Sequence, residues 1–277
     1  MSELEPLLIT LDFFSNISPG GPGIPNTSVD GRFLTVDFDQ QGVVIADLKK
    51  GVARGIIGEE FLQSDLHLRY YILEAVALSM ISALRAVALH AACIAWKGIG
   101  ILLCGESGAG KTTLAYACAR VGWTYVSGDA SYLVLPSRTS RVVGNHHQIR
   151  FRDAATKLFD ELACKRVSSR IGGKPSIELP TAELADIRTT PYADIECILF
   201  LNRNADLQPS LHPMETTAVS DYFERFFLIP PDSGSPLKDA MNRLLSVPAF
   251  ELRYAHLDSA VSFLTQAIGN ASKWPVG

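Results

Sequence analysis

The chain has 277 residues, of which 47% are hydrophobic and 19% are charged, and its formal net charge is −4. This balance is typical of a globular protein and excludes a disordered chain, and the length allows one large domain or two modest ones. The slight negative net charge gives no electrostatic sign of a nucleic-acid-binding protein, so we expect no nucleic-acid partner.

Residues 1–64 carry a β-rich pattern. Alternating apolar side chains at 7–11 and 33–38, followed by the apolar run 42–47, predict strands of a small antiparallel sheet. The stretch 18–26 is rich in glycine and proline, which predicts a loop within this region. We therefore expect residues 1–64 to form a small β-rich N-terminal subdomain.

Residues 66–87 carry apolar side chains at helical spacing, which predicts a helix that buries one face against the domain that follows. The overlapping stretch 75–95 is apolar enough to suggest a membrane span, but Arg85 and His90 lie inside it. We therefore expect a core helix followed by a strand, and no contact with a membrane.

An apolar run from Ile99 to Cys104 predicts a buried strand. It leads directly into Gly-Glu-Ser-Gly-Ala-Gly-Lys-Thr at 105–112, a complete Walker A sequence of the form G-x-x-x-x-G-K-[ST], and then into a helix expected over 113–121. Strand, glycine-rich turn and helix in this order are the context that a phosphate-binding loop (P-loop) requires. The motif therefore predicts a site for a nucleotide.

The residue types of this motif suit phosphate chemistry. Glycines let backbone N–H groups approach phosphate oxygens, and the positive end of the following helix favours negative charge. Lys111 would add a charge for the β- and γ-phosphates, and the hydroxyl of Thr112 would bind Mg²⁺. The residues expected to contact the nucleotide are Gly105, Glu106, Ser107, Gly108, Ala109, Gly110, Lys111, Thr112 and Thr113.

The rest of the chain alternates between strand and helix patterns, interrupted by a polar, arginine-rich segment after a strand expected at 124–126. An apolar run at 195–201 predicts a central strand. The elements expected after it are helices at 218–228 and 237–245, a strand at 250–254 and a helix at 260–268. The aromatic stretch 222–227 predicts a core-facing side of its helix rather than a nucleotide-stacking surface. We expect an α/β fold with its ligand at the C-terminal ends of the strands.

The stretch from His90 through the motif to Asp129 resembles the catalytic domain of the HPr kinase/phosphorylase family. The residues that fall at the spacing of that family are His90, Gly100, Gly105, Gly110, Lys111 and Asp129. The resemblance implies that residues 65–277 form a P-loop kinase-like catalytic domain of the HPr kinase and phosphoenolpyruvate-carboxykinase-like type. It also implies ATP and Mg²⁺ as ligands, with catalytic roles for His90, Lys111 and Asp129.

The resemblance gives each of these residues a role. His90 is expected beside the reacting group, and Lys111 and Thr112 are expected to contact phosphate and Mg²⁺. Asp129 resembles the family's general base toward a substrate hydroxyl. A carboxylate near Mg²⁺ can orient a hydroxyl and accept its proton as the bond to phosphorus forms. Thr112 and Asp129 are therefore the expected metal residues.

Two features differ from the family. Gly128 stands where the family has the first of two aspartates, and the family's later Glu-x-Arg-Gly signature is not present. The stretch 142–152 resembles that region only loosely, and it leaves Arg150 and Arg152 as candidate phosphate contacts. These differences favour an acceptor other than HPr.

The sequence as a whole predicts a kinase that uses ATP and Mg²⁺ to phosphorylate a hydroxyl, on a serine of a peptide or protein or on a small molecule. The alternative, which Gly128 favours, is a nucleotide-binding regulatory or scaffold protein with little or no kinase activity. The five cysteines are widely spaced and odd in number, which is typical of reduced thiols in the cytoplasm. The resembled family forms hexamers, and the sequence leaves a homo-oligomer or a monomer open.

Overall fold

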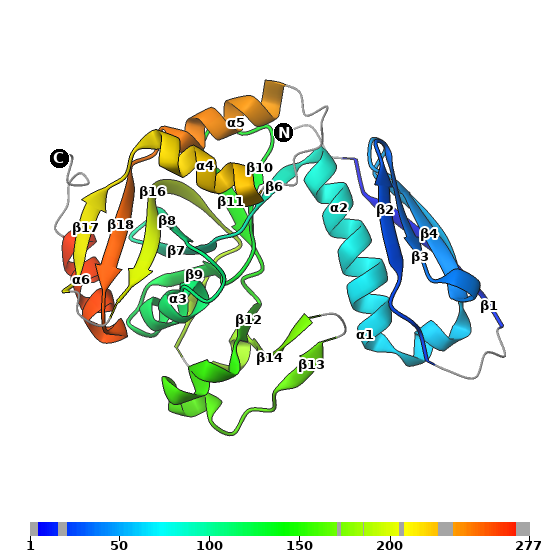
Figure 1. Ribbon diagram of the computed structural model, residues 1–277, viewed down its shortest axis with the longest axis horizontal. Coiled ribbons are helices and arrows are strands. Elements are labelled where there is room, and N and C mark those ends of the chain that lie inside the picture. The colour runs from blue at the N-terminus through cyan, green and yellow to red at the C-terminus, as the bar shows by residue number, and fades with distance from the viewer. Residues whose placement is uncertain are drawn as a thin grey trace. The chain divides into compact units, whose positions relative to one another are not determined.

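The computed structural model describes residues 5–15, 21–170, 173–184, 186–204, 208–226 and 235–269. The chain divides into two compact units, one that consists mainly of residues 1–86 and one that consists mainly of residues 87–277. Both units combine helices with β-sheet, so the fold belongs to the mixed α/β class (Figure 1). Among the helices of the described chain, none combines the length and the apolar composition that a membrane span needs.

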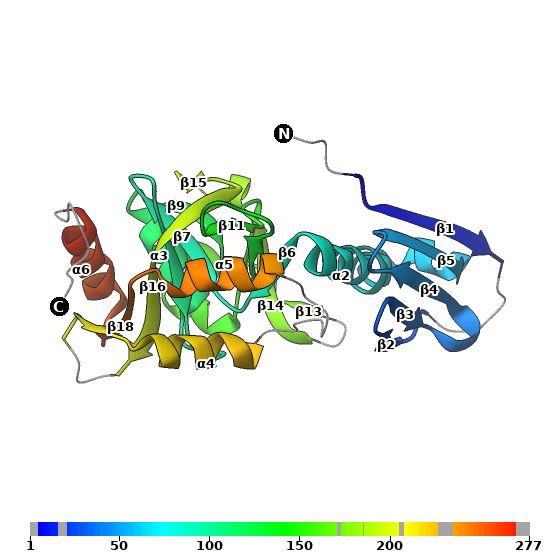
Figure 2. The same ribbon diagram turned by 90° about the horizontal axis from the view of Figure 1, so that it is seen from above.

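In the N-terminal unit, five strands of the described chain form one sheet in the order β1-β5-β4-β3-β2 (Figure 2). Their bounds are Leu8–Phe14 (β1), Asn26–Asp30 (β2), Phe33–Asp37 (β3), Gly42–Asp47 (β4) and Val52–Gly58 (β5). The strands expected at 7–11, 33–38 and 42–47 are confirmed as β1, β3 and β4. The expectation of a purely antiparallel sheet is wrong, because β1 pairs with β5 in parallel. A parallel neighbour needs a crossover connection, and here the intervening strands supply it.

Three helical segments follow this sheet along the chain, namely α1 (Asp65–His67), a π-helix (Leu68–Glu74) and α2 (Ala75–Leu84). Ile72, Val76 and Met80 are fully buried and belong to the same apolar core as residues of β3, β4 and β5. The helix expected at 66–87 is confirmed over residues 65–84, and its buried face packs on the N-terminal sheet, where the following domain was expected. Helical spacing of apolar residues shows which face is buried and not what covers it.

The boundary between the two units falls after Ala86. It differs from the boundary expected at residue 64, because the helical segment belongs to the core of the N-terminal sheet. Residues 65–86 therefore belong to the N-terminal unit in the structure.

In the C-terminal unit, ten strands of the described chain form a sheet whose main path is β15-β9-β7-β8-β16-β11-β10-β6, and β18 pairs with both β16 and β17. Their bounds are Ala86–Leu89 (β6), Ala92–Trp96 (β7), Ile99–Cys104 (β8), Thr124–Ser127 (β9), Ser131–Val134 (β10), Arg141–Gly144 (β11), Arg188–Thr189 (β15), Tyr192–Arg203 (β16), Ser210–Pro213 (β17) and Ala249–Tyr254 (β18). The strands expected at 124–126, 195–201 and 250–254 are confirmed as β9, β16 and β18. β16 runs parallel to β8 and to β18.

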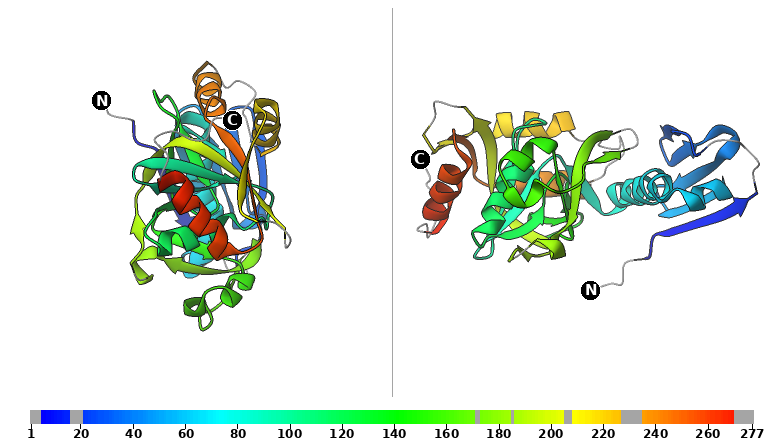
Figure 3. Two further views of the ribbon diagram at one scale, coloured as in Figure 1. Left: turned by 90° about the vertical axis from the view of Figure 1, so that its left-hand side faces the viewer. Right: turned by 90° about the horizontal axis from the view of Figure 1, so that it is seen from below.

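Helices cover both faces of this sheet (Figure 3). Their bounds are Lys111–Arg120 (α3), Thr216–Phe226 (α4), Ser235–Leu245 (α5) and Leu257–Gly269 (α6). Along β8, Ile101 and Leu103 belong to the apolar core that contains α3 and α6, whereas Leu102 and Cys104 belong to the core that contains α4 and α5. Because both faces of β8 are buried, its sequence is a continuous apolar run.

A further sheet has the order β12-β14-β13, with bounds Gln148–Phe151 (β12), Gly173–Pro180 (β14) and Ser168–Arg170 (β13). Buried residues of β12 and β14 belong to the same apolar core as α3, namely Ile149, Phe151, Ile177 and Leu179. The sequence predicted only a polar, arginine-rich segment here, because polar and charged residues are frequent in these strands. They line the core on the side of α3.

Candidate functional site

The topology of the central sheet brings three separate segments to one edge. β7 lies between β8 and β9 and runs antiparallel to both. The C-terminal ends of β8 and β9 therefore lie at the same edge as the N-terminal end of β7. The loop 105–110 follows β8, Asp129 follows β9, and His90 precedes β7. The residues that the sequence singled out on separate segments thus meet at one edge of the sheet.

The loop 105–110 has the backbone that its glycines predict. Gly105, Gly108 and Gly110 adopt φ angles of 145°, 91° and 96°, a range that residues with a Cβ rarely enter. A Cβ at Gly108 would meet no atom within 4 Å, so this glycine is required by its conformation and not by lack of space. Gly110 is the left-handed residue directly before the first turn of α3. The glycine positions of the motif therefore have a structural explanation.

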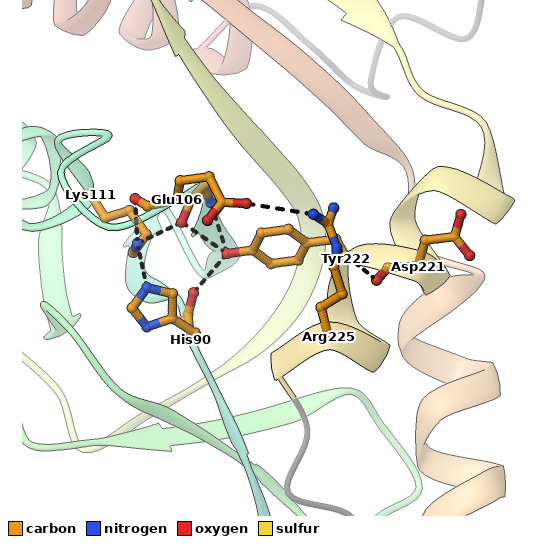
Figure 4. Close-up of polar contacts among 7 residues, drawn as sticks. His90, Glu106, Lys111, Asp221, Tyr222 and Arg225 are labelled. Atoms are coloured by element: carbon orange, nitrogen blue, oxygen red, sulfur yellow. Dashed lines mark hydrogen bonds and ion pairs between the residues drawn. The ribbon is translucent and has the colours of Figure 1, made fainter.

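Lys111 is the first residue of α3, and its side chain folds back on the loop. Only 6% of Lys111 is exposed. Its Nζ donates to the carbonyl oxygen of Gly105 at 2.7 Å and to that of Glu106 at 3.2 Å, and lies 3.0 Å from Nε2 of His90 (Figure 4). Burial lowers the pKa of Lys111, while the carboxylates of Asp129 and Glu106 oppose that shift. A buried ammonium group needs acceptors, and here the loop's own carbonyl oxygens provide them.

His90 completes the set of acceptors around Lys111. Because the ammonium group can only donate, Nε2 of His90 must accept, which makes the ring neutral. Burial lowers the pKa of His90, and the charge of Lys111 lowers it further, against the effects of Asp129 and Glu106. The lowered pKa of His90 favours a neutral imidazole beside Lys111.

We expect this arrangement to make stability depend on pH. The pKa of His90 in the folded chain lies below its ordinary value of 6.5, so the unfolded chain binds the proton at higher pH than the folded chain. The free energy of unfolding should therefore fall as the pH drops below about 6.5. Urea unfolding of the wild type and of His90→Gln at neutral and mildly acidic pH measures this. Parallel pH profiles for the two proteins would contradict the assignment, since His67 and His146, whose pKa values are also lowered, remain in both.

The hydroxyl of Thr112 connects α3 to the end of β9. Its Oγ1 donates to the carbonyl oxygen of Gly128 at 2.5 Å. A Cβ on Gly128 would lie 2.8 Å from the hydroxyl oxygen of Tyr125 and 3.0 Å from Cγ2 of Thr112. The position where the resembled family has an aspartate is thus closely surrounded by its neighbours, and its backbone contacts the residue expected to bind Mg²⁺.

Gly128→Ala should therefore weaken the protein and its site together. The added Cβ has to displace Thr112 or Tyr125, and overpacking of this kind costs about 1–3 kcal/mol of stability. Thermal unfolding and titration with ATP and Mg²⁺ measure the two effects. Gly21→Ala is the matched control, because a Cβ there meets no atom within 4 Å. Adding Thr112→Ser removes Cγ2 and should restore part of the loss, and no restoration would show that Thr112 is not the obstacle.

Asp129 lies at the same edge with its side chain exposed. Its charge raises the pKa of both His90 and Lys111, so the carboxylate is close enough to act on each of them. An exposed carboxylate beside a buried ammonium group is accessible to a molecule that enters from solvent. This geometry is compatible with the predicted role of Asp129, which stays a prediction.

Arg150 and Arg152 lie on β12 and directly after it. Nε of Arg150 pairs with Oε1 of Glu178 on β14 at 2.7 Å, and Gln148 donates to the other oxygen of the same carboxylate at 3.1 Å. Arg152 is exposed and precedes a 3-10 helical segment. A phosphate contact by either arginine stays a prediction, and for Arg150 it requires an exchange of partner.

Helix α4 contributes two residues that the sequence did not assign to the site. The aromatic side of this helix is buried, and Tyr222 is 4% exposed, as expected for a core position. Its hydroxyl, however, contacts the backbone of the loop, and Arg225 pairs with Glu106 across 3.7 Å (Figure 4). The sequence signal that could have identified Tyr222 is that it is the single tyrosine among the phenylalanines of 222–227. A buried tyrosine hydroxyl needs a hydrogen-bond partner, whereas a phenylalanine ring does not.

No family profile and no curated protein is matched by this sequence. Among solved structures, the chain is similar to the Hpr(Ser) kinase/phosphatase from Coxiella burnetii, with 14% sequence identity and a TM-score of 0.37. The similarity covers 66% of this chain and 94% of that chain. At this level the relationship is distant, so function has to be inferred from the residues of the site themselves.

The donor set of the site fits Mg²⁺ that enters with a nucleotide. The described part of the chain holds no group of three or more His, Cys, Asp or Glu residues arranged to bind a metal. Mg²⁺ prefers oxygen ligands and is commonly bound through one or two protein groups together with waters and phosphates. Thr112 and Asp129 offer a hydroxyl and a carboxylate at the same edge of the sheet. These two residues would hold the ion.

Proposed function

We propose that this protein is an ATP- and Mg²⁺-dependent kinase that transfers the γ-phosphoryl group to a hydroxyl. The observation that carries the proposal is the meeting of three groups at one sheet edge: the glycine loop 105–110, the buried ammonium of Lys111 and the exposed carboxylate of Asp129. A loop and a helix N-terminus favour an anion, and the carboxylate adds a group that can accept a proton. A site that only binds an anion would not need the carboxylate of Asp129.

The contacts of Lys111 support the proposed binding of phosphate. Its ammonium donates to two loop carbonyl oxygens and lies against His90, which are all neutral acceptors. Hydrogen bonds between an ammonium group and phosphate oxygens are charge-assisted and roughly twice as strong as neutral ones. A nucleotide that enters the loop would therefore replace some of these contacts without leaving Lys111 unpaired.

Thr112 and Asp129 would hold the metal. When bound with the nucleotide, Mg²⁺ would neutralise charge on the β- and γ-phosphates. The O–H of Thr112 donates to Gly128, which directs its proton away and leaves the oxygen lone pairs for a cation. The carbonyl oxygen of Gly128 thus orients the hydroxyl in the absence of an aspartate side chain at that position.

Asp129 is the proposed base for the transfer. Its carboxylate would accept the proton of the acceptor hydroxyl while the new oxygen–phosphorus bond forms and the bond between the γ-phosphorus and the oxygen of ADP breaks. Lys111 would stabilise the negative charge that develops on ADP. His90 is neutral and holds Lys111 in place, so we assign it to the site as a partner of the ammonium group. The acceptor is a serine of a peptide or protein, or a small molecule.

Phosphoryl transfer from γ-labelled ATP tests the proposal. The full chain is incubated with labelled ATP, Mg²⁺ and extract of the source cells, and the label is followed in protein and in small molecules. We expect wild type to label an acceptor that Asp129→Asn does not label. The alternative, a nucleotide-binding regulatory or scaffold protein, is favoured by Gly128, which stands where the resembled family has an aspartate. Tight binding of ATP without any labelled acceptor would support that alternative. Oligomeric state and location in the cytoplasm stay predictions.

A further inference from the structure

Tyr222 connects helix α4 to the loop from the opposite side of the sheet. It lies 117 residues after Gly105 in the chain, and α4 belongs to the apolar core opposite to that of α3. Its ring contacts Phe200 and Phe223 edge to face, with centroids 4.9 Å and 5.5 Å away. Burial raises the pKa of Tyr222, so the hydroxyl keeps its proton. The packing holds a neutral hydroxyl at a fixed place.

That hydroxyl bridges two backbone segments of the site. It accepts the N–H of Gly105 at 2.9 Å, and it lies 3.0 Å from the carbonyl oxygen of His90 and 3.0 Å from that of Gly105 (Figure 4). A phenol has one proton to donate and two lone pairs, so it can satisfy this N–H and one of the two carbonyl groups at a time. Tyr222 therefore contacts both the start of the loop and the segment before β7.

Both segments, the start of the loop and the segment before β7, contact the ammonium group of Lys111. The carbonyl oxygen of Gly105 accepts from Nζ of Lys111 at 2.7 Å, and the ring of His90 lies 3.0 Å from the same atom. Gly105 has a φ of 145°, and a glycine peptide has other backbone conformations open to it. The bond from Tyr222 favours the one conformation in which this carbonyl group faces Lys111.

We propose that Tyr222 is a positioning residue of the nucleotide site, which acts through the peptide of Gly105 on the place of Lys111. This inference rests on the proposed function, because it assigns Lys111 to the β- and γ-phosphates. Arg225, on the same helix, pairs with Glu106, the residue after Gly105 in the loop. Both side chains of that pair are exposed, so the pair is a weaker contact than the buried one of Tyr222.

Tyr222→Phe tests the proposal, because it removes the hydroxyl and keeps the ring. Tyr116→Phe is the matched control: Tyr116 is 2% exposed, and its hydroxyl donates to Glu161 at 2.6 Å, away from the loop. Binding of ATP with Mg²⁺ and binding of AMP are measured by titration of the full chain, together with thermal unfolding. We expect Tyr222→Phe to weaken ATP binding roughly tenfold, since one buried hydrogen bond is lost. AMP lacks the β- and γ-phosphates, so its binding should change little.

The control separates positioning from a merely structural role. Tyr116→Phe should lower thermal stability to a similar extent and leave the ratio of ATP to AMP affinity unchanged. The proposal is overturned if Tyr222→Phe binds ATP as tightly as wild type, or if its ATP and AMP affinities fall in equal proportion. Failure of the proposed function has a different signature, because wild type would then bind ATP but transfer no phosphoryl group. That result would leave the role of Tyr222 in binding intact.

Discussion

Replacing Lys111 with methionine should reduce phosphoryl transfer by roughly 10²–10³-fold, because it removes the cation that faces the phosphates of the transition state in the proposed mechanism. Methionine matches the apolar stem of lysine as far as Cε and lacks only the terminal ammonium group, so the packing at the start of α3 changes little. Binding of ATP with Mg²⁺ should weaken along with transfer. Labelled ATP for transfer and titration for binding measure the two effects.

Stability should respond differently from binding. Burial lowers the pKa of Lys111, which means that folding disfavours its charged form, and removal of the charge offsets the loss of its contacts with the loop. We therefore expect Lys111→Met to unfold at nearly the wild-type temperature although its affinity for ATP is reduced. Lys157→Met, at an exposed lysine of a 3-10 helical segment, should change neither property. Wild-type affinity for ATP in Lys111→Met would contradict the placement of this lysine in a phosphate site.

The strand, loop and helix around the motif were predictable because their signals are local. A continuous apolar run predicts β8, glycines at fixed spacing predict the left-handed backbone of the loop, and the following residues predict α3. The same holds for β3, β4, β16 and the helices, whose apolar periodicity reflects their own buried faces. In each case the pattern lies within one element, so no knowledge of its neighbours is needed.

Features that depend on what packs against an element were not predictable. The helical spacing of apolar residues at 66–87 was visible in the sequence, but the N-terminal sheet that covers the buried residues Ile72, Val76 and Met80 was not. Apart from β14, the strands between residues 130 and 190 have two to four residues, which is too short for a reliable periodic signal. β1 had a clear strand pattern, but its parallel neighbour is set by the connection and not by β1 itself.

The candidate site shows the same division. His90, Lys111 and Asp129 come from separate segments of the chain. They meet at one edge of the sheet because β7 lies between β8 and β9 and runs antiparallel to both. Gly128 lacks the carboxylate of the resembled family, and the structure places its carbonyl oxygen against Thr112, with side-chain atoms of Tyr125 and Thr112 close to where a Cβ would lie. Tyr222 was visible only as a core aromatic residue, because its partner lies 117 residues away in the chain.

Asp129→Asn should reduce phosphoryl transfer by roughly 10²-fold or more and leave ATP binding nearly unchanged. The amide has the shape of the carboxylate and can still act as an oxygen ligand, but it cannot accept the proton of the acceptor hydroxyl. Transfer from labelled ATP and titration with ATP and Mg²⁺ measure the two properties separately. Asp160→Asn, at an exposed aspartate on a 3-10 helical segment, is the matched control and should behave as wild type.

A second measurement, the pKa of His90, reports the position of Asp129 and does not require an acceptor substrate. Its carboxylate raises the pKa of His90, so Asp129→Asn should lower that pKa further, and titration of the imidazole by NMR follows it. A lowered pKa of His90 with unchanged transfer would keep Asp129 at the site and exclude it as the base. An unchanged pKa together with unchanged transfer would remove Asp129 from the site altogether. The expected result, a lowered pKa of His90, loss of transfer and retained ATP binding, requires that the carboxylate lies close to the imidazole of His90 and to the acceptor.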